Sequence, residues 1–249
     1  MNSGSSSYIY GRQPTIVALS QKISIERIFL LSGGDREFEK EIRNLIKGRN
    51  IEISYVPREK LNRLTSGNHQ GVVAYVNDYE YYSLDDLLQN IRSKNETPFI
   101  FMLDQLTDVR NFGAIARSAL LGGCHGIIIP SQNSVSVTSD AMKASAGALA
   151  RLPVCKTTSL PEAADHLAQQ GIQLFVSGMD HTTYLHQLPL EEPCCIVMGS
   201  EKTGVSKAIE SRADQLFSIP QNDLLDSFNV SVASGIVVYQ TMLRRRFQL

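Results

Sequence analysis

Three short loops in the C-terminal half of the chain contain residues that could do chemistry at a sugar or a phosphate. They run from Asp108 to Arg117, from Val197 to Val205 and from Ile219 to Asn229. Each loop follows an apolar run typical of a strand and precedes a helical pattern. In the first loop, Gly113 lets the backbone approach a neighbouring group closely. Because the first N–H groups of a helix have no partner inside it, such loops can hold a small polar ligand. Judged by shape alone, an ordinary strand-to-helix turn remains the more frequent explanation.

The polar side chains of these loops suggest particular roles. Arg117 lies on an otherwise apolar helix, so its guanidinium needs an anionic or acceptor partner. That partner is either a carboxylate, such as Asp104 or Glu201, or a phosphate or ribose hydroxyl, and the residues favour neither. Ser227 and Asn229 are both good N-cap types for the last helix.

The elements around the loops indicate a mostly parallel sheet. From Pro98 onward, expected strands alternate with expected helices: strands at 99–103, 126–129, 151–155, 173–176, 195–198 and 215–219, helices at 112–121, 139–149, 161–170, 205–212 and 229–244. Nearly uninterrupted apolar strands are typical of an α/β sheet covered by helices on both faces. Ligands of such sheets bind beyond the carboxyl ends of the strands, where all three loops can meet.

The residues before this domain predict a second, smaller one. Residues 1–77 show a small α/β pattern after a Ser- and Gly-rich start at 1–7 without regular structure, with expected strands at 27–31, 51–56 and 71–76 and helices at 14–20, 36–47 and 58–64. Residues 78–97 are acidic and polar and predict a linker with a short helix at 84–91. The predicted domains are therefore 1–77 and 98–249.

Charge is distributed unevenly between the two domains. The whole chain of 249 residues has a net charge of −1, yet residues 1–77 carry 11 Lys and Arg against 7 Asp and Glu. Residues 78–249 carry 13 against 18. A basic first domain suits a nucleic-acid partner, although chance explains such a difference equally well.

The absence of several motifs argues against several classes of protein. The sequence has no GxGxxG after the first strand of either domain, no GxxxxGK[ST] and no GxSxG, which argues against dinucleotide-binding domains, P-loop NTPases and serine hydrolases. His181 and His186 have no accompanying ligand set, so we expect loop histidines and no metal. Four cysteines without CxxC spacing indicate buried thiols and a cytoplasmic setting. We see no signal peptide and no apolar run long enough for a membrane.

Taken together, the three loops resemble the motifs of the SPOUT methyltransferases, in the SpoU or TrmH branch. The matching residues, in the same order and spacing, are Asn111-Phe112-Gly113 with Arg117, Gly199-Ser200-Glu201 with Gly204, and Ile219-Pro220 with Ser227-Phe228-Asn229-Val230-Ser231. Lys202 stands where Gly is frequent and Phe228 where Leu is frequent. The segments 11–19 and 69–74 resemble the L30e-like RNA-binding domain joined to many of these enzymes.

The resemblance implies a fold and an activity. The fold would be a SPOUT domain with a C-terminal trefoil knot, in a homodimer. The activity would be transfer of a methyl group from S-adenosylmethionine to a ribose 2′-hydroxyl, closest to the type that acts on a guanosine of 23S ribosomal RNA. The alternatives are a transfer-RNA guanosine, an antibiotic-resistance enzyme of the same branch, and a non-catalytic RNA-binding or ribosome-assembly protein.

The resemblance also implies roles for individual residues. Arg117 would activate the hydroxyl, with Asn111, Glu201, Ser227 and Asn229 orienting it and the ribose. Since a guanidinium hardly gives up a proton, lowering the pKa of the hydroxyl or gripping a phosphate is physically easier than acting as a base. Backbone groups near Ser177, Gly199, Ile219 and Phe228 would hold the cofactor. Candidates for RNA backbone contacts are Arg12, Arg27, Lys60 and Arg63, each equally explained as surface charge.

Overall fold

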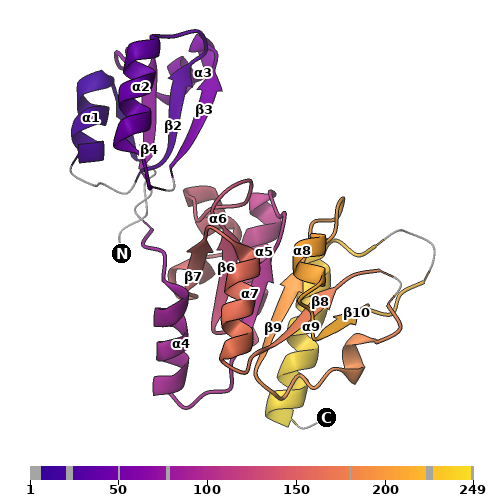
Figure 1. Ribbon diagram of the computed structural model, residues 1–249. Coiled ribbons are helices and arrows are strands. Elements are labelled where there is room, and N and C mark those ends of the chain that lie inside the picture. Colours follow the sequence, from indigo (N-terminus) through magenta and orange to yellow (C-terminus); the bar gives the residue numbers. More distant parts are fainter. Residues whose placement is uncertain are drawn as a thin grey trace. The chain divides into compact units, whose positions relative to one another are not determined.

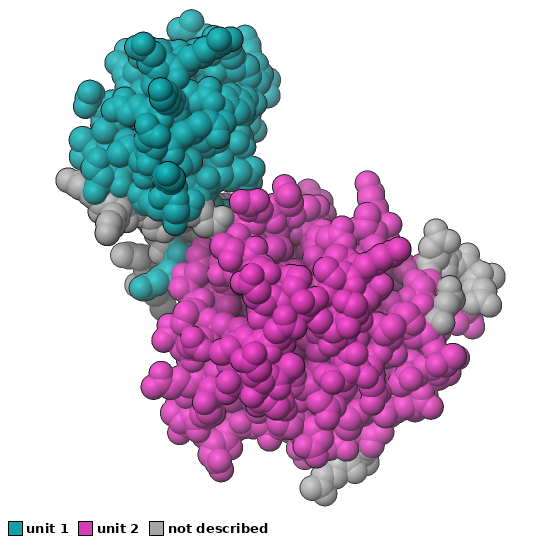
Figure 2. All heavy atoms as spheres, in the orientation of Figure 1, with its two compact units in different colours: residues 1–80 teal, residues 81–249 magenta. Residues whose placement is uncertain are grey.

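The chain forms two compact units. The computed structural model describes residues 7–20, 25–49, 51–76, 79–179, 181–222 and 227–247. Unit 1 comprises residues 1–80 and unit 2 residues 81–249 (Figure 2). The expected irregular start at 1–7 lies outside the described residues, except for Ser7, which begins the first strand.

Unit 1 is a four-stranded sheet covered by helices (Figure 1). Its elements are β1 (Ser7–Tyr10), α1 (Arg12–Ser20), β2 (Ile25–Leu31), α2 (Arg36–Leu45), β3 (Glu52–Val56), α3 (Arg58–Leu64) and β4 (Val72–Val76). The strand order is β1-β4-β2-β3, with β2 and β3 parallel and the other pairs antiparallel. Apolar side chains of α1 and α2, such as Leu19 and Ile42, pack on Ile28 and Val72 of the sheet to form its core.

Unit 2 alternates helices and strands along the chain. Its helices are α4 (Leu84–Ser93), α5 (Val109–Leu121), α6 (Ser139–Ala144), α7 (Leu160–Gln169), α8 (Lys207–Glu210) and α9 (Val230–Met242), with the short helical turns η1 (Ala148–Ala150), η2 (Leu185–Gln187) and η3 (Leu243–Phe247). Its strands are β5 (Phe99–Leu103), β6 (Gly126–Pro130), β7 (Val154–Thr157), β8 (Gln173–Ser177), β9 (Cys194–Met198) and β10 (Gln215–Phe217).

The six strands of unit 2 form one parallel sheet in the order β10-β8-β9-β5-β6-β7. On one face, α4, α7 and α8 bury Leu87, Leu167 and Ile209 against alternate strand residues. On the other face, the ring centroids of Phe99 and Phe101 lie 5.5 Å apart with tilted ring planes, and the guanidinium of Arg245, after α9, lies over the Phe99 ring. The predicted parallel sheet with helices on both faces is confirmed.

The segment predicted as a linker contributes to the core of unit 2. Helix α4 occupies residues 84–93, and its Leu87, Leu88 and Ile91 are buried. Ser83 caps this helix by accepting a hydrogen bond from the N–H of Asp86. The acidic residues that suggested a linker lie on the solvent side of an amphipathic helix.

The cysteines occupy the interior of unit 2. Cys124, Cys155, Cys194 and Cys195 are all buried and free, as expected. Burial raises the pKa of the Cys124 thiol to about 12. Among the residues that the structure describes, no cluster of His, Cys, Asp or Glu could hold a metal ion, and no helix has the length and apolar character needed to cross a membrane.

Candidate functional site

The three loops meet at the carboxyl edge of the sheet of unit 2. Glu201 joins them: its Oε1 accepts hydrogen bonds from Asn111 Nδ2 at 3.3 Å and from Asn229 Nδ2 at 2.6 Å. The N–H of Val230, at the start of α9, also donates to this oxygen at 3.3 Å. Asn229 Nδ2 further donates to Asn111 Oδ1 at 3.1 Å. One side chain from each loop therefore takes part in a single polar network.

Helix caps position two members of this network. Asp108 caps α5, accepting from the N–H groups of Arg110 at 2.7 Å and Asn111 at 3.3 Å. Asn229 caps α9, accepting from the N–H of Ser231 at 2.9 Å. Of the two expected N-cap residues, Asn229 takes the position and Ser227 lies exposed two residues before it. Both asparagines thus sit at helix starts, where the backbone is fixed and the local field favours a carboxylate such as Glu201.

The loop that carries Glu201 is held from the end of β5. Asp104, a buried carboxylate, accepts from the N–H of Ser206 at 2.8 Å. Gln105 accepts from Thr203 Oγ1 at 2.9 Å, and its amide donates to the carbonyl of Gly204 at 3.4 Å. A Cβ added at Gly199 would lie 2.2 Å from the backbone carbon of Gly204, so the loop closes tightly on itself.

A cavity of about 600 Å³ opens beside the network at the carboxyl ends of β8, β9 and β10. Its lining includes all four residues predicted near the cofactor: Ser177, Gly199, Ile219 and Phe228. Glu201 and Ser227 line it as well. The volume lies within the range of pockets that bind cofactors and other small ligands, about 300–1,000 Å³.

The chemistry of the cavity lining suits a nucleoside-like cofactor. Met179, Tyr184 and Phe228 expose 49%, 42% and 39% of their surface around the cavity, which provides apolar contact for a flat ring. Gly199 brings backbone close to the same space. The residues present therefore fit S-adenosylmethionine.

Arg117 lies on the solvent-exposed side of α5, outside the lining of this cavity. Neither carboxylate considered as its partner pairs with it: Asp104 accepts from Ser206, and Glu201 belongs to the network. Within the described residues Arg117 has no hydrogen bond or ion pair. The guanidinium is thus available to a group from outside this chain.

Gly113 makes the close approach that the sequence predicts, and the neighbour is another helix. A Cβ at Gly113 would lie 2.4 Å from Ala144 Cβ and 2.8 Å from the backbone nitrogen of Ser145. The glycine therefore allows α5 to pack closely on the end of α6.

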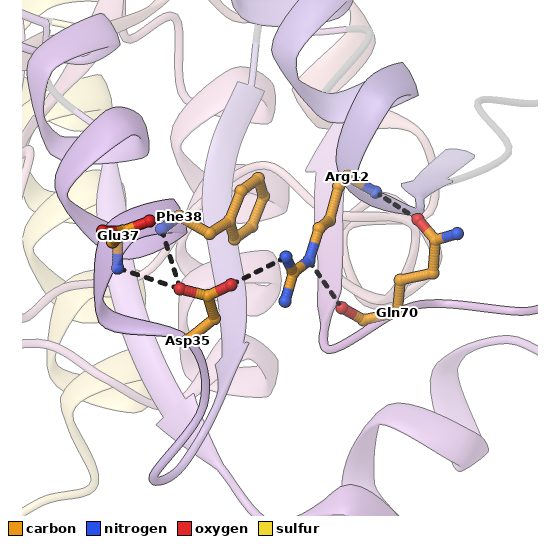
Figure 3. A network of polar contacts seen from close by, with 5 residues as sticks. All are labelled: Arg12, Asp35, Glu37, Phe38 and Gln70. Carbon is orange, nitrogen blue, oxygen red and sulfur yellow. Dashed lines mark hydrogen bonds and ion pairs between the residues drawn. The ribbon is translucent and has the colours of Figure 1, made fainter.

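The four basic residues proposed for RNA contact differ in their surroundings. Arg12 pairs with Asp35 at 2.8 Å and lies near Gln70, as Figure 3 shows. Hydrogen bonds from the backbone of Phe38, followed by Arg12, hold the pKa of Asp35 below its usual value. Arg27 pairs with Glu52 at 2.6 Å. Lys60 and Arg63 are exposed on α3, without an ion pair among the described residues.

Sequence reasoning did not identify the residues that support and line this site. Gln105 and Thr203 fix the Glu201 loop, while Met179, His181 and Tyr184 line the cavity. A signal existed for Gln105, because it follows a buried strand at the edge where ligands bind. For the lining of the cavity, the path of the chain between β8 and β9 had to be known.

Comparison with known proteins identifies the family of both parts of the chain. Residues 98–239 match the model of the SpoU rRNA Methylase family, and residues 8–82 match that of the RNA 2′-O ribose methyltransferase substrate binding domain. YacO of Bacillus subtilis, named as a TrmH family tRNA/rRNA methyltransferase, is 33% identical over 238 residues, covering 96% of each chain. A tRNA/rRNA methyltransferase of Mycolicibacterium vanbaalenii is 35% identical over 240 residues, covering 96% of this chain and 76% of that protein.

Solved structures share the fold. The SpoU methyltransferase AviRb from Streptomyces viridochromogenes in complex with AdoMet gives a TM-score of 0.61 at 23% identity, covering 96% of this chain and 90% of that one. The AdoMet-bound rRNA methyltransferase from Sinorhizobium meliloti gives 0.59 at 21% identity, covering 98% and 88%. The chain therefore belongs to the SpoU rRNA methylase family.

Proposed function

We propose that this protein is an RNA 2′-O-methyltransferase that uses S-adenosylmethionine and acts on the ribose of a guanosine in 23S ribosomal RNA. The observation that carries the proposal is the junction of Asn111, Glu201 and Asn229 beside a cavity large enough for the cofactor. The match of residues 8–82 to a substrate-binding domain supports an RNA substrate.

The residues of the site have separate roles in the reaction. Ser177, Gly199, Ile219 and Phe228 surround the cofactor, which when bound supplies an activated methyl group. Glu201 fixes the asparagines at the starts of α5 and α9, so that their polar groups keep one orientation toward the ribose. Alignment of reacting groups can be worth about 7–11 kcal/mol.

Arg117 acts on the nucleotide. Its exposed guanidinium stabilises negative charge on the 2′-oxygen as the hydroxyl loses its proton to solvent, or holds an adjacent phosphate. Lys60 and Arg63, exposed on α3 of unit 1, contribute charge toward the RNA backbone. Arg12 and Arg27 are each paired with a carboxylate, so their contribution requires exchange of that partner.

We also propose that two chains associate through α5 and α9. Leu121 exposes 72% of its surface, Val232 51% and Tyr239 59%, which is unusual for apolar residues on packed helices. A second copy covering this face would approach Arg117. Among the proposed catalytic side chains, Arg117 alone neither lines the cofactor cavity nor belongs to the polar network around Glu201. The trefoil knot implied by the family resemblance likewise remains a prediction.

The direct test maps 2′-O-methyl groups on ribosomal and transfer RNA from cells with and without the protein. We expect one guanosine of 23S RNA to lose its methyl group in its absence. A mark lost from transfer RNA instead would correct the substrate, and no lost mark would contradict the activity.

A variant isolates the role of Arg117. We expect Arg117→Ala to abolish methyl transfer to the substrate RNA while S-adenosylmethionine binding, measured by calorimetry, is retained. Full activity of this variant would remove Arg117 from the mechanism.

A further inference from the structure

A second cavity in unit 2 lies at the opposite edge of the sheet from the candidate site. It has a volume of about 910 Å³ and is lined by segments that precede strands: Glu96 and Thr97 before β5, His125 before β6, and Arg151 before β7. The ends of α4 and α9, which lie at the same end of unit 2 in Figure 1, complete it. None of the residues proposed for catalysis or cofactor binding lines this cavity.

Positive charge is concentrated around this cavity. Residues 78–249 carry 13 Lys and Arg against 18 Asp and Glu, so the domain is acidic as a whole. Two carboxylates line the cavity, Glu96 and Glu191, against five cations: Lys94, Arg151, Arg244, Arg245 and Arg246. The cavity therefore presents a locally positive field on an acidic domain, an arrangement that attracts anions.

The arginines at the end of the chain leave this charge unneutralised. Arg245 donates to the carbonyl oxygens of Thr97, Pro98, Leu190 and Glu192 at 2.6–2.8 Å, and no carboxylate of the described residues pairs with it. Arg244 donates one N–H to the carbonyl of His186, but its Nε is buried and has no hydrogen-bond partner among the described residues. A buried donor of this kind is costly unless a ligand accepts from it.

The rim of the cavity provides the remaining contacts. Lys94, Arg151 and Arg246 are exposed, come from three separate segments, and form no ion pair within the described part of the chain. Tyr82 also lines the cavity and exposes 46% of its surface. Cations that track a backbone, together with an exposed aromatic ring on which a base stacks, are the combination that binds single-stranded nucleic acid.

From these observations we infer that the cavity at the amino edge of the sheet is a second RNA-binding site. It holds a single-stranded segment of the substrate RNA, with phosphates on Lys94, Arg151 and Arg246 and a base on Tyr82. The inference rests on the proposed function, since the ligand is the substrate RNA. The two edges of the sheet are separated by the length of a five-residue strand, about 17 Å. The RNA segment in this cavity is therefore not the target nucleotide, and its binding affects RNA affinity rather than the chemical step.

Salt dependence tests the phosphate contacts. The probe is a 5′-fluorescein-labelled, mixed-sequence single-stranded RNA, titrated by anisotropy at several salt concentrations against the full chain. We expect the triple variant Lys94→Gln/Arg151→Gln/Arg246→Gln to bind at least tenfold more weakly at low salt. The slope of log K against log salt should fall by about 2, since each phosphate contact on a single strand contributes about 0.7. An unchanged affinity and slope would overturn the inference.

Matched variants separate local contacts from general effects of charge. Glu191 lines the cavity and Glu192 does not, so Glu191→Gln should strengthen RNA binding while Glu192→Gln leaves it unchanged. On the end of α4, Lys94→Gln should weaken binding and Arg92→Gln should not. Tyr82→Ala should weaken binding, whereas Tyr82→Phe keeps the stacking ring. Equal effects within each pair would contradict the site.

A parallel measurement distinguishes this inference from the proposed function. The triple variant, Lys94→Gln and Tyr82→Ala should bind S-adenosylmethionine as the wild type does and should raise the KM for 23S RNA without changing kcat. If the wild type binds cofactor and methylates RNA but the variants match it, the second site is wrong and the function stands. If the wild type binds neither cofactor nor RNA, both proposals fail.

Discussion

Gln105 shows how one residue can shape the candidate site from outside it. Its backbone adopts a φ of +57°, a conformation that costs a non-glycine residue free energy. The side chain offsets this cost by its contacts with Thr203 and Gly204. We therefore regard Gln105 as a positioning residue for the loop that carries Glu201.

Replacing Gln105 by glycine should separate stability from binding. In Gln105→Gly the backbone strain is relieved, so the melting temperature should not fall. The contacts with the loop are lost, each worth about 0.5–1.5 kcal/mol, so calorimetry should show S-adenosylmethionine binding weakened about fivefold. Asn95→Gly, at a φ of +53° and far from the site in the sequence, is the matched control and should leave binding unchanged. Equal affinity in both variants would contradict this role.

His125 makes stability depend on pH. Burial lowers the pKa of His125, although the nearby Glu96 at 3.2 Å partly opposes this effect. Its Nδ1 accepts a hydrogen bond from the N–H of Phe99 at 3.0 Å, which requires a neutral ring. Because the pKa is lower in the folded state, the associated stability is present above the usual value of 6.5 and is lost as the pH falls through the folded pKa.

Urea unfolding at two pH values measures this contribution. Between about pH 7.5 and about pH 5, the free energy of unfolding should fall less in His125→Gln, which does not titrate, than in the wild type. His166→Gln, which alters a half-buried histidine hydrogen-bonded to Asp85, is the control and should keep the wild-type difference. The same difference in His125→Gln as in the wild type would exclude His125 as the source.

At the scale of elements, the loop from Gly199 to Val205 is tightly closed on its own backbone. The added Cβ at Gly199 would lie 2.3 Å from the carbonyl oxygen of Gly204 and 2.5 Å from the nitrogen of Val205, so backbone must move to admit it. This close contact forms the turn that places Glu201 between α5 and α9.

Gly199→Ala should therefore open the loop. We expect the variant to stay folded by circular dichroism but to lose S-adenosylmethionine binding by at least tenfold. In Gly235→Ala the new methyl group meets nothing closer than Ser118 Oγ at 3.9 Å, and a helical glycine is replaced by a better helix former. That control should bind the cofactor normally; retained binding in Gly199→Ala would show that the loop is more adaptable than the contacts indicate.

Two helices differ from their sequence-based bounds for identifiable reasons. The helix expected at 139–149 ends at Ala144, because Ala146 and Gly147 adopt positive φ values of +49° and +82° before the turn η1. The helix expected at 205–212 is shorter in the structure, where α8 spans Lys207–Glu210. It begins after Ser206, because the N–H of Ser206 donates a hydrogen bond to the carboxylate of Asp104 at the end of β5. Periodicity identified both segments, but bonds to other parts of the chain decided their limits.

At the scale of the whole molecule, the position of Arg117 would link the proposed catalysis to the proposed association of two chains. The side chain is exposed on α5, and the cavity of its own chain does not include it. If two chains associate through α5 and α9, Arg117 of one can serve the cavity of its partner. A site shared in this way follows from an isologous interface.

Mixing two inactive variants tests the shared site. Arg117→Ala and Gly199→Ala should each lack activity, but a refolded equimolar mixture should regain up to about a quarter of wild-type methyl transfer, because half of the dimers are mixed and each has one intact site. Analytical ultracentrifugation confirms that mixed dimers have formed. No activity in such dimers would show that Arg117 serves its own chain.

The sequence by itself located the strands, the helices and the three loops of the second domain, although the helix expected from 112 begins at Val109. Those features depend on local patterns: apolar runs, a capping residue such as Asn229, and glycines where the chain turns. The parallel sheet followed, because alternating strands and helices have few other ways to pack. Family motifs then indicated the chemistry.

Only the tertiary structure decided which side chains meet. The contact of Glu201 with Asn111 and Asn229 joins residues 90 and 28 positions apart, and no local pattern encodes such a distance. The same holds for the outward position of Arg117, the packing of α4 into unit 2 and the arginines gathered at the amino edge of the sheet. Contacts between distant segments depend on the summed packing of the core, which fixes in space the strand ends from which these side chains project.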